Sequence, residues 1–173
     1  PSGLGLEELG AALRVRSIPE SVVSNVLRAI ARQRQLLKLY RTRAGGGRPN
    51  EHEVVAYLVL PLLFALGWTE EQLALEWNNV DVAGFSGSAT SHDNCVMICE
   101  AKALSNGLSG VLAQAVGYYE QHALKNCRRI LITQGSRFYL YTPGHETEWS
   151  PSGYINIENI RANHIIPAGT SAI

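Results

Sequence analysis

The chain has 173 residues, of which 46% are apolar, and this composition excludes an intrinsically disordered chain and a miniprotein that depends on disulfides. The longest apolar stretch, Val54 to Trp68, is shorter than a membrane span and contains Pro61, so we expect no contact with a membrane. There is no secretory signal, and the three cysteines lack metal-finger spacing, which together favour a reduced, cytoplasmic protein.

Charge divides the chain into two parts, although 15 basic and 15 acidic residues balance overall. Residues 1–50 hold nine Lys or Arg against three Glu, a local charge of +6, and residues 51–173 hold six against twelve, a local charge of −6. From 20 to 43, apolar residues recur at helical spacing, which predicts one amphipathic helix with a basic outer face. The glycine-rich segment before Pro49 then ends this helix.

The basic face has three interpretations. Charged helix faces are most often only solvated. Alternatively, the face binds nucleic-acid phosphates, with DNA as the expected partner. A third interpretation is a dimerisation helix, which makes a homodimer possible. The side chains that we expect to bind nucleic acid are Arg32, Arg34, Lys38, Arg41 and Arg43.

The remaining elements begin at Asn50, which forms a capping box with Glu53. A helix is predicted from Glu51 to Leu66, with a kink at Pro61. After it we predict an extended segment at 74–85 interrupted at Asn78-Asn79, a loop at 84–94, a buried strand at 95–103, a helix at 109–125, a hairpin of strands 129–133 and 137–141, and a strand near Tyr154–Ile157. This order predicts an α/β fold with a mixed sheet flanked by helices, in which residues 1–49 are an N-terminal basic helical extension and residues 50–173 form one domain.

The most buried predicted strand ends in two opposite charges, Glu100 and Lys102. Residues i and i+2 of a strand share a face, so these side chains are expected to lie together. Burying charges at the end of a central strand is costly unless they are paired or functional. One interpretation is a structural ion pair.

Asp81 favours a functional interpretation. If residues 79–85 pair antiparallel with 95–102, Asp81 lies near the level of Glu100, and two carboxylates and an amine converge. Two oxygen ligands suit Mg²⁺, and a metal-bound water beside a lysine suits hydrolysis of a phosphodiester.

Asp81 followed by Glu100-x-Lys102 resembles the motif of the PD-(D/E)xK nuclease superfamily, with Val80 in the place of the proline. Glu51 followed by YLVLPLLFALGW resembles the first helix of the nuclease domain at the N-terminus of type I restriction enzyme R subunits. Gln114 and Tyr118 resemble that family's Q-x-x-x-Y pair. ILITQGSRFYLY resembles the family's next hairpin, and the resemblance covers about residues 50–142.

The resemblance implies a restriction-endonuclease-like αβββαβ core and a role for each matched residue. Asp81 and Glu100 would bind Mg²⁺, which Mn²⁺ can replace, and Glu51 would be a third metal-binding carboxylate. Lys102 would act at the attacking water, and Gln114 and Tyr118 would lie beside the site. Taken alone, Glu51 is a favourable charge at a helix N-terminus, and Gln114 and Tyr118 are a helix–sheet packing pair.

The sequence leaves two classes of function open. The first is a metal-dependent DNA endonuclease, a hydrolase of phosphodiester bonds. The second is a catalytically inactive, nuclease-like module that binds nucleic acid or a partner protein. The presence of all three charges, Asp81, Glu100 and Lys102, favours the first.

Overall fold

The computed structural model describes residues 3–43, 47–104, 106–144 and 148–161. In these ranges all α-helices but one precede the first strand, and the last α-helix lies between two strands. Short 3-10 and π segments lie between some of these elements. The helices are α1 (Leu6–Val15), α2 (Glu20–Thr42), α3 (Glu51–Val54), α4 (Leu60–Ala65) and α5 (Val111–Gln121). The strands are β1 (Leu73–Trp77), β2 (Val80–Phe85), β3 (Cys95–Ala101), β4 (Arg129–Thr133), β5 (Arg137–Pro143) and β6 (Trp149–Asn156).

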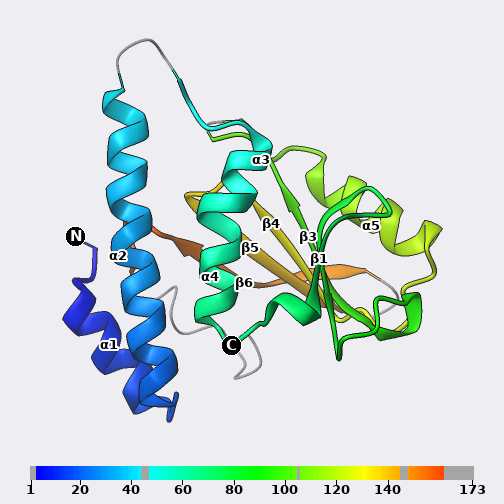
Figure 1. The fold of residues 1–173 in the computed structure, drawn as a ribbon, viewed down its shortest axis with the longest axis horizontal. Helices are drawn as coiled ribbons and strands as arrows, with labels where there is room; N and C mark the ends of the chain where they lie inside the picture. The colour runs from blue at the N-terminus through cyan, green and yellow to red at the C-terminus, as the bar shows by residue number, and fades with distance from the viewer. Residues whose placement is uncertain (1–2, 44–46, 105, 145–147, 162–173) are drawn as a thin grey trace.

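The six described strands form one mixed sheet in the order β1-β2-β3-β4-β5-β6. Strands β3 and β4 are parallel, and α5 makes the crossover between them; the other described neighbours are antiparallel. Helices α2 and α4 lie side by side on one side of the sheet and α5 lies on the other (Figure 1). The predicted α/β class and mixed sheet are therefore confirmed.

The helix predicted from Glu51 to Leu66 is one continuous rod of α3, a π-helical segment (Val55–Val59) and α4. The predicted capping box is present, since the Asn50 side chain accepts from the Glu53 N–H and the Glu53 carboxylate accepts from the Asn50 N–H. Pro61 has no N–H for the preceding turn, and the wider π turn lies directly before it. The side-chain amide of Gln33, from α2, donates to the Leu58 carbonyl in this turn.

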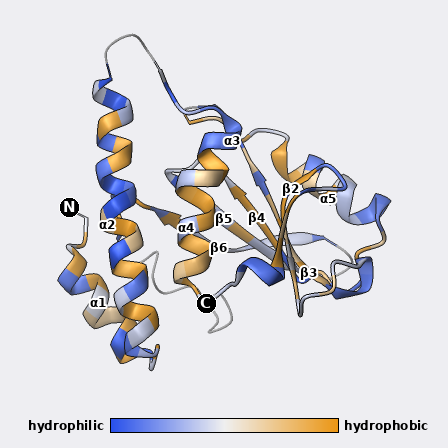
Figure 2. Ribbon diagram, viewed as in Figure 1, coloured by the Kyte–Doolittle hydropathy of each residue, from blue (hydrophilic) through white to orange (hydrophobic). Residues whose placement is uncertain are grey.

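The core consists of two apolar clusters, one on each side of the sheet. The first joins α1, α2, the α3–α4 rod and the sheet, and its α2 members include Val23, Val26, Ile30, Leu37 and Tyr40. The second lies between the sheet and α5. Figure 2 shows the outer side of α2 as largely hydrophilic. The N-terminal helices thus share a core with the rest of the chain.

One helix was missed by the sequence predictions, and two predicted elements differ from the structure in extent. Helix α1 was not predicted, and α5 is shorter than the predicted 109–125. Strand β6 begins earlier than predicted, at Trp149, and ends at Asn156 instead of Ile157. The predicted interruption at Asn78-Asn79 is confirmed: it is a hairpin turn in which both residues have positive φ, and it divides the segment into two strands, β1 and β2.

No helix in the described ranges is long and apolar enough to cross a membrane. Cys95, Cys99 and Cys127 are free and buried, and each packs in an apolar cluster as a small apolar group.

Candidate active site

The carboxylates of Asp81 and Glu100 meet between the adjacent antiparallel strands β2 and β3. The register Val82↔Cys99 and Ala83↔Ile98, continued by one pair, places Asp81 opposite Glu100. Asp81 Oδ2 accepts a 2.6 Å hydrogen bond from the Ala101 N–H, and Glu100 Oε1 accepts a 3.4 Å bond from the Asp81 N–H. The predicted antiparallel pairing is confirmed, and it brings both side chains to one face of the sheet.

Both carboxyl groups lie where their ionisation is unfavourable. Glu100 is only 1% exposed, and burial together with the charge of Asp81 raises its pKa to about 8. Burial is also the main cause of the raised pKa of Asp81, and Glu51 acts in the same direction. Two like charges, one buried and one half-buried, resist joint ionisation, and a cation between them would relieve this cost.

Lys102 follows β3 and forms an ion pair with Glu51, at the start of α3, with 3.4 Å between Nζ and Oε2. Both residues act on the pKa values of Asp81 and Glu100, so the four charged groups form one cluster. The structural alternative was an ion pair between Glu100 and Lys102. The ion pair that Lys102 makes in the structure is with Glu51 instead.

The start of α3 explains the position of Glu51. The Asn50 capping box fixes the helix N-terminus one residue before it, and the Lys102 backbone N–H is held by the Thr133 carbonyl at 2.8 Å. A local helix signal and a strand end therefore bring these two side chains together.

Within the described part of the chain, no group of three or more His, Cys, Asp or Glu side chains is arranged to hold a metal ion. Of the three predicted metal-binding carboxylates, Asp81 and Glu100 lie together, whereas Glu51 is paired with Lys102.

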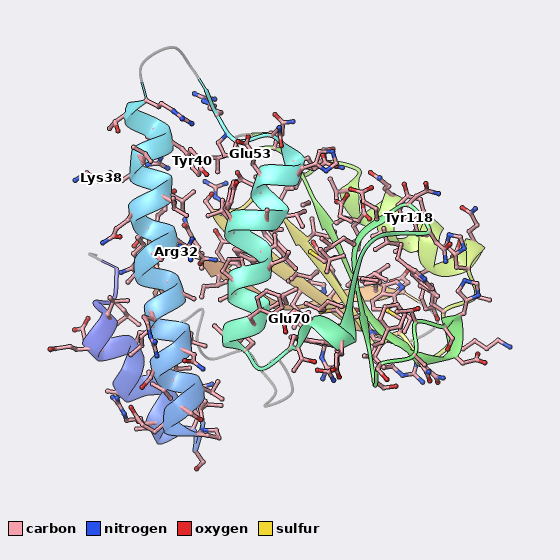
Figure 3. All side chains as sticks on the ribbon, viewed as in Figure 1. Arg32, Lys38, Tyr40, Glu53, Glu70 and Tyr118 are labelled. Carbon is pink, nitrogen blue, oxygen red and sulfur yellow. The ribbon has the colours of Figure 1, made fainter. Side chains whose placement is uncertain are left out.

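Gln114 and Tyr118 lie on α5, which covers the sheet face that carries Ile98 and, by alternation, Glu100. The Gln114 side-chain amide donates to the Tyr118 hydroxyl at 3.1 Å, so the pair interacts as its i, i+4 spacing predicts. Figure 3 places Tyr118 on the opposite side of the α3–α4 rod from α2.

The five basic residues predicted to bind nucleic acid separate into two groups. Arg34 Nε donates to the Ile157 carbonyl at 2.7 Å, and Arg41 pairs with Glu158 at 2.6 Å, so both hold α2 against the segment after β6. Lys38 projects from the outer side of α2, and Arg32 and Arg43 are also exposed (Figure 3). Among these five, an external anion can reach Arg32, Lys38 and Arg43 without breaking the hydrogen bond of Arg34 or the ion pair of Arg41.

Glu76, at the end of β1, also raises the pKa of Asp81 by its charge, and the sequence did not single it out. Its positive φ of 52° belongs to an irregular strand end that the alternation of apolar residues does not signal.

No protein-family model, curated protein or solved structure matched the chain. The resemblance to the nuclease superfamily therefore depends on the residues quoted from the sequence and on their geometry.

Proposed function

We propose that the protein is a metal-dependent endonuclease that hydrolyses phosphodiester bonds in DNA. The observation that carries this proposal is the meeting of Asp81 and Glu100 beside the Lys102–Glu51 ion pair. The order of elements from α3 to β4, which is αβββαβ when the α3–α4 rod counts as one helix, supports a restriction-endonuclease-like core.

The donor set fits Mg²⁺ or Mn²⁺. Both oxygen donors are carboxylates with raised pKa values, and a divalent cation offsets the repulsion between them. When bound, such a cation lowers the pKa of a coordinated water and neutralises charge on the phosphate.

Each residue of the candidate site then has a defined role. Asp81 and Glu100 would hold the cation, and the backbone N–H groups of Ala101 and Asp81 orient these carboxylates. Lys102 orients the attacking water, and Glu51 fixes the direction of the lysine side chain. Gln114 and Tyr118 lie on the helix that borders this face and position the substrate.

The exposed basic residues of α2 supply sequence-independent affinity for phosphates. The C-terminal half of α2, with Lys38, lies toward the same end of the molecule as the start of α3 (Figure 1). Arg32, Lys38 and Arg43 are the members of the basic face that remain for this role.

Plasmid nicking tests the proposal. The purified chain is incubated with supercoiled DNA in Mg²⁺, in Mn²⁺ and in excess chelator, beside the variants Lys102→Ala and Lys125→Ala. Lys125 is an exposed lysine after α5 and serves as the matched control. Metal-dependent nicking that Lys102→Ala abolishes and Lys125→Ala retains supports the nuclease. Equal activity of both variants, or no nicking in either metal, refutes it and leaves the non-catalytic binding module.

A further inference from the structure

A cross-strand row of side chains leads from the candidate active site to the far edge of the sheet. Glu100 pairs with Ile132, Ile132 with Tyr139, and Tyr139 with Tyr154. Directly paired residues point to the same face, so Tyr139 and Tyr154 lie on the face that carries the two carboxylates. Since neighbouring strands are about 4.8 Å apart, Tyr139 lies about 10 Å and Tyr154 about 14 Å from Glu100 along this row.

The two tyrosines form one aromatic unit. Their ring centroids are 4.7 Å apart and the rings are inclined by 47°. Arg137 precedes Tyr139 by two residues and pairs with Asn156, so it shares their face. Asn156 and Tyr139 both form side-chain hydrogen bonds with Tyr154, and the charge of Arg137 also acts on its hydroxyl.

Helix α5 contacts β6 at Trp149, where the ring centroids of Tyr119 and Trp149 are 5.2 Å apart, and Tyr154 lies five residues further along β6. The buried members of the α5 cluster come from α5 itself, β2, β3, β4 and the adjoining segments, whereas Tyr139, Tyr141 and Trp149, from β5 and β6, are partly buried against it. Tyr139 and Tyr154 are half-buried and Arg137 is exposed. The two rings are therefore held in place by the sheet while part of each surface remains accessible.

We propose that Tyr139, Tyr154 and Arg137 form a binding site for an unpaired nucleic-acid strand that continues from the candidate active site. A tyrosine ring stacks on a base only when the base is exposed, which excludes the interior of an intact duplex. The direct line to Glu100 crosses Ile132, which is 3% exposed, so the strand reaches the carboxylates around the Arg137 end of the sheet, over at least about three stacked bases at 3.4 Å per base. Arg137 provides the positive charge for the phosphate of the same strand.

This binding site depends on the proposed function in one respect only, namely that the bound strand is cut at the candidate active site. Its substrate class is accordingly DNA with a single-stranded segment next to the scissile phosphate, such as a flap, a gap or a displaced strand. The strand's bases lie over the two tyrosines, and its backbone passes Arg137 before it reaches the carboxylates.

Binding in excess chelator tests the site without any cleavage. The probes are a fluorescein-labelled oligothymidylate, an abasic strand of equal length and a duplex of equal length, measured by fluorescence anisotropy. Tyr139→Ala should weaken oligothymidylate binding about tenfold, the loss expected for one stacked base, and Tyr139→Phe should retain it. Tyr57→Ala, at an exposed tyrosine on the π segment, is the control and should leave the affinity unchanged.

Photocrosslinking of the unmodified protein gives a result that does not depend on how a variant folds. An oligonucleotide with 5-iododeoxyuridine should crosslink to the peptide that contains Tyr139 or to the one that contains Tyr154. Crosslinks confined to other peptides, equal binding of the abasic strand, or an affinity that Tyr139→Ala leaves unchanged would each overturn the site. A chain that binds as expected but never cleaves in Mg²⁺ or Mn²⁺ retains the site and refutes the nuclease, whereas cleavage without these binding effects refutes the site alone.

Discussion

Glu100→Gln separates a metal site from a structural carboxylate because it removes the charge and preserves the shape. The glutamine oxygen can still accept from the Asp81 N–H, as Glu100 Oε1 does at 3.4 Å. The Glu100 side chain is 1% exposed, so solvent screens its charge very little.

The sign of the stability effect follows from the raised pKa. The ordinary pKa of the glutamate is 4.5, and in the folded chain it is about 8. Between these values the folded state binds more protons than the unfolded state, so the metal-free protein loses stability as the pH rises through this window. Each pH unit costs about 1.4 kcal/mol, which gives about 3 kcal/mol at pH 7.

Glutamine carries no such cost. In the absence of metal, Glu100→Gln should therefore raise the free energy of unfolding at pH 7 by about 3 kcal/mol and the melting temperature by about 6–12 °C, with little change near pH 4. The same variant should lose the stabilisation that Mg²⁺ gives the parent chain and should lose DNA cleavage, on the order of a thousandfold or more in rate.

The assay is thermal unfolding by circular dichroism at pH 4, 7 and 8.5, in chelator and in Mg²⁺. Asp93→Asn, at an exposed aspartate before β3, controls for the loss of one negative charge. A variant that is less stable than the parent chain at every pH would show that Glu100 has a stabilising charged partner, and burial would then not set its pKa.

Three further predictions concern the remaining charges. Lys102→Ala should abolish metal-dependent nicking while the melting temperature changes little, because partly exposed ion pairs contribute about 0–1 kcal/mol; nicking and thermal unfolding of one preparation check this. Arg34→Ala should lower the free energy of unfolding in urea by about 1–3 kcal/mol through the loss of a charged donor, more than the exposed Arg41→Ala does, and equal midpoints would contradict this. Replacing Arg32 and Lys38 by Gln should reduce the slope of log affinity for duplex DNA against log salt by about two, and an unchanged slope would return α2 to a solvated surface.

The elements that the sequence predicted best are those whose signals are local. The nearly continuous apolar run located the buried strand β3, and the Asn50 capping box located the start of α3. Helix α1 was missed because Gly5, at its N-cap, has no side chain to give the usual signal, although Glu8 accepts from the Gly5 N–H. The early start of β6 was missed because Pro151 argues against a strand, whereas an edge strand tolerates a proline on its unpaired side.

The candidate site was predictable only where it depends on one strand pairing. Asp81 meets Glu100 because β2 and β3 are consecutive and antiparallel, which the sequence already suggested. The internal contacts of Arg34 and Arg41 reach the segment after β6, more than a hundred residues away in sequence, and no local pattern reports such contacts. The amphipathic pattern of α2 therefore predicted its buried side but could not separate structural arginines from free ones.

To place Tyr139 and Tyr154 on the face of Glu100 from the sequence would have required three further strand pairings and the end of α5. Each additional pairing has to be in register, since a slip by one residue turns the side chain to the other face. The parallel β3–β4 pair also requires α5 to cross over the sheet, and the length of α5 decides which strands it covers. Helix α5 packs over β2, β3 and β4 and reaches β6 at Trp149, so Tyr139 and Tyr154 lie at the border of the covered area and stay half-buried. The position of this helix thus decides how much of each tyrosine ring stays accessible on the face that carries the carboxylates.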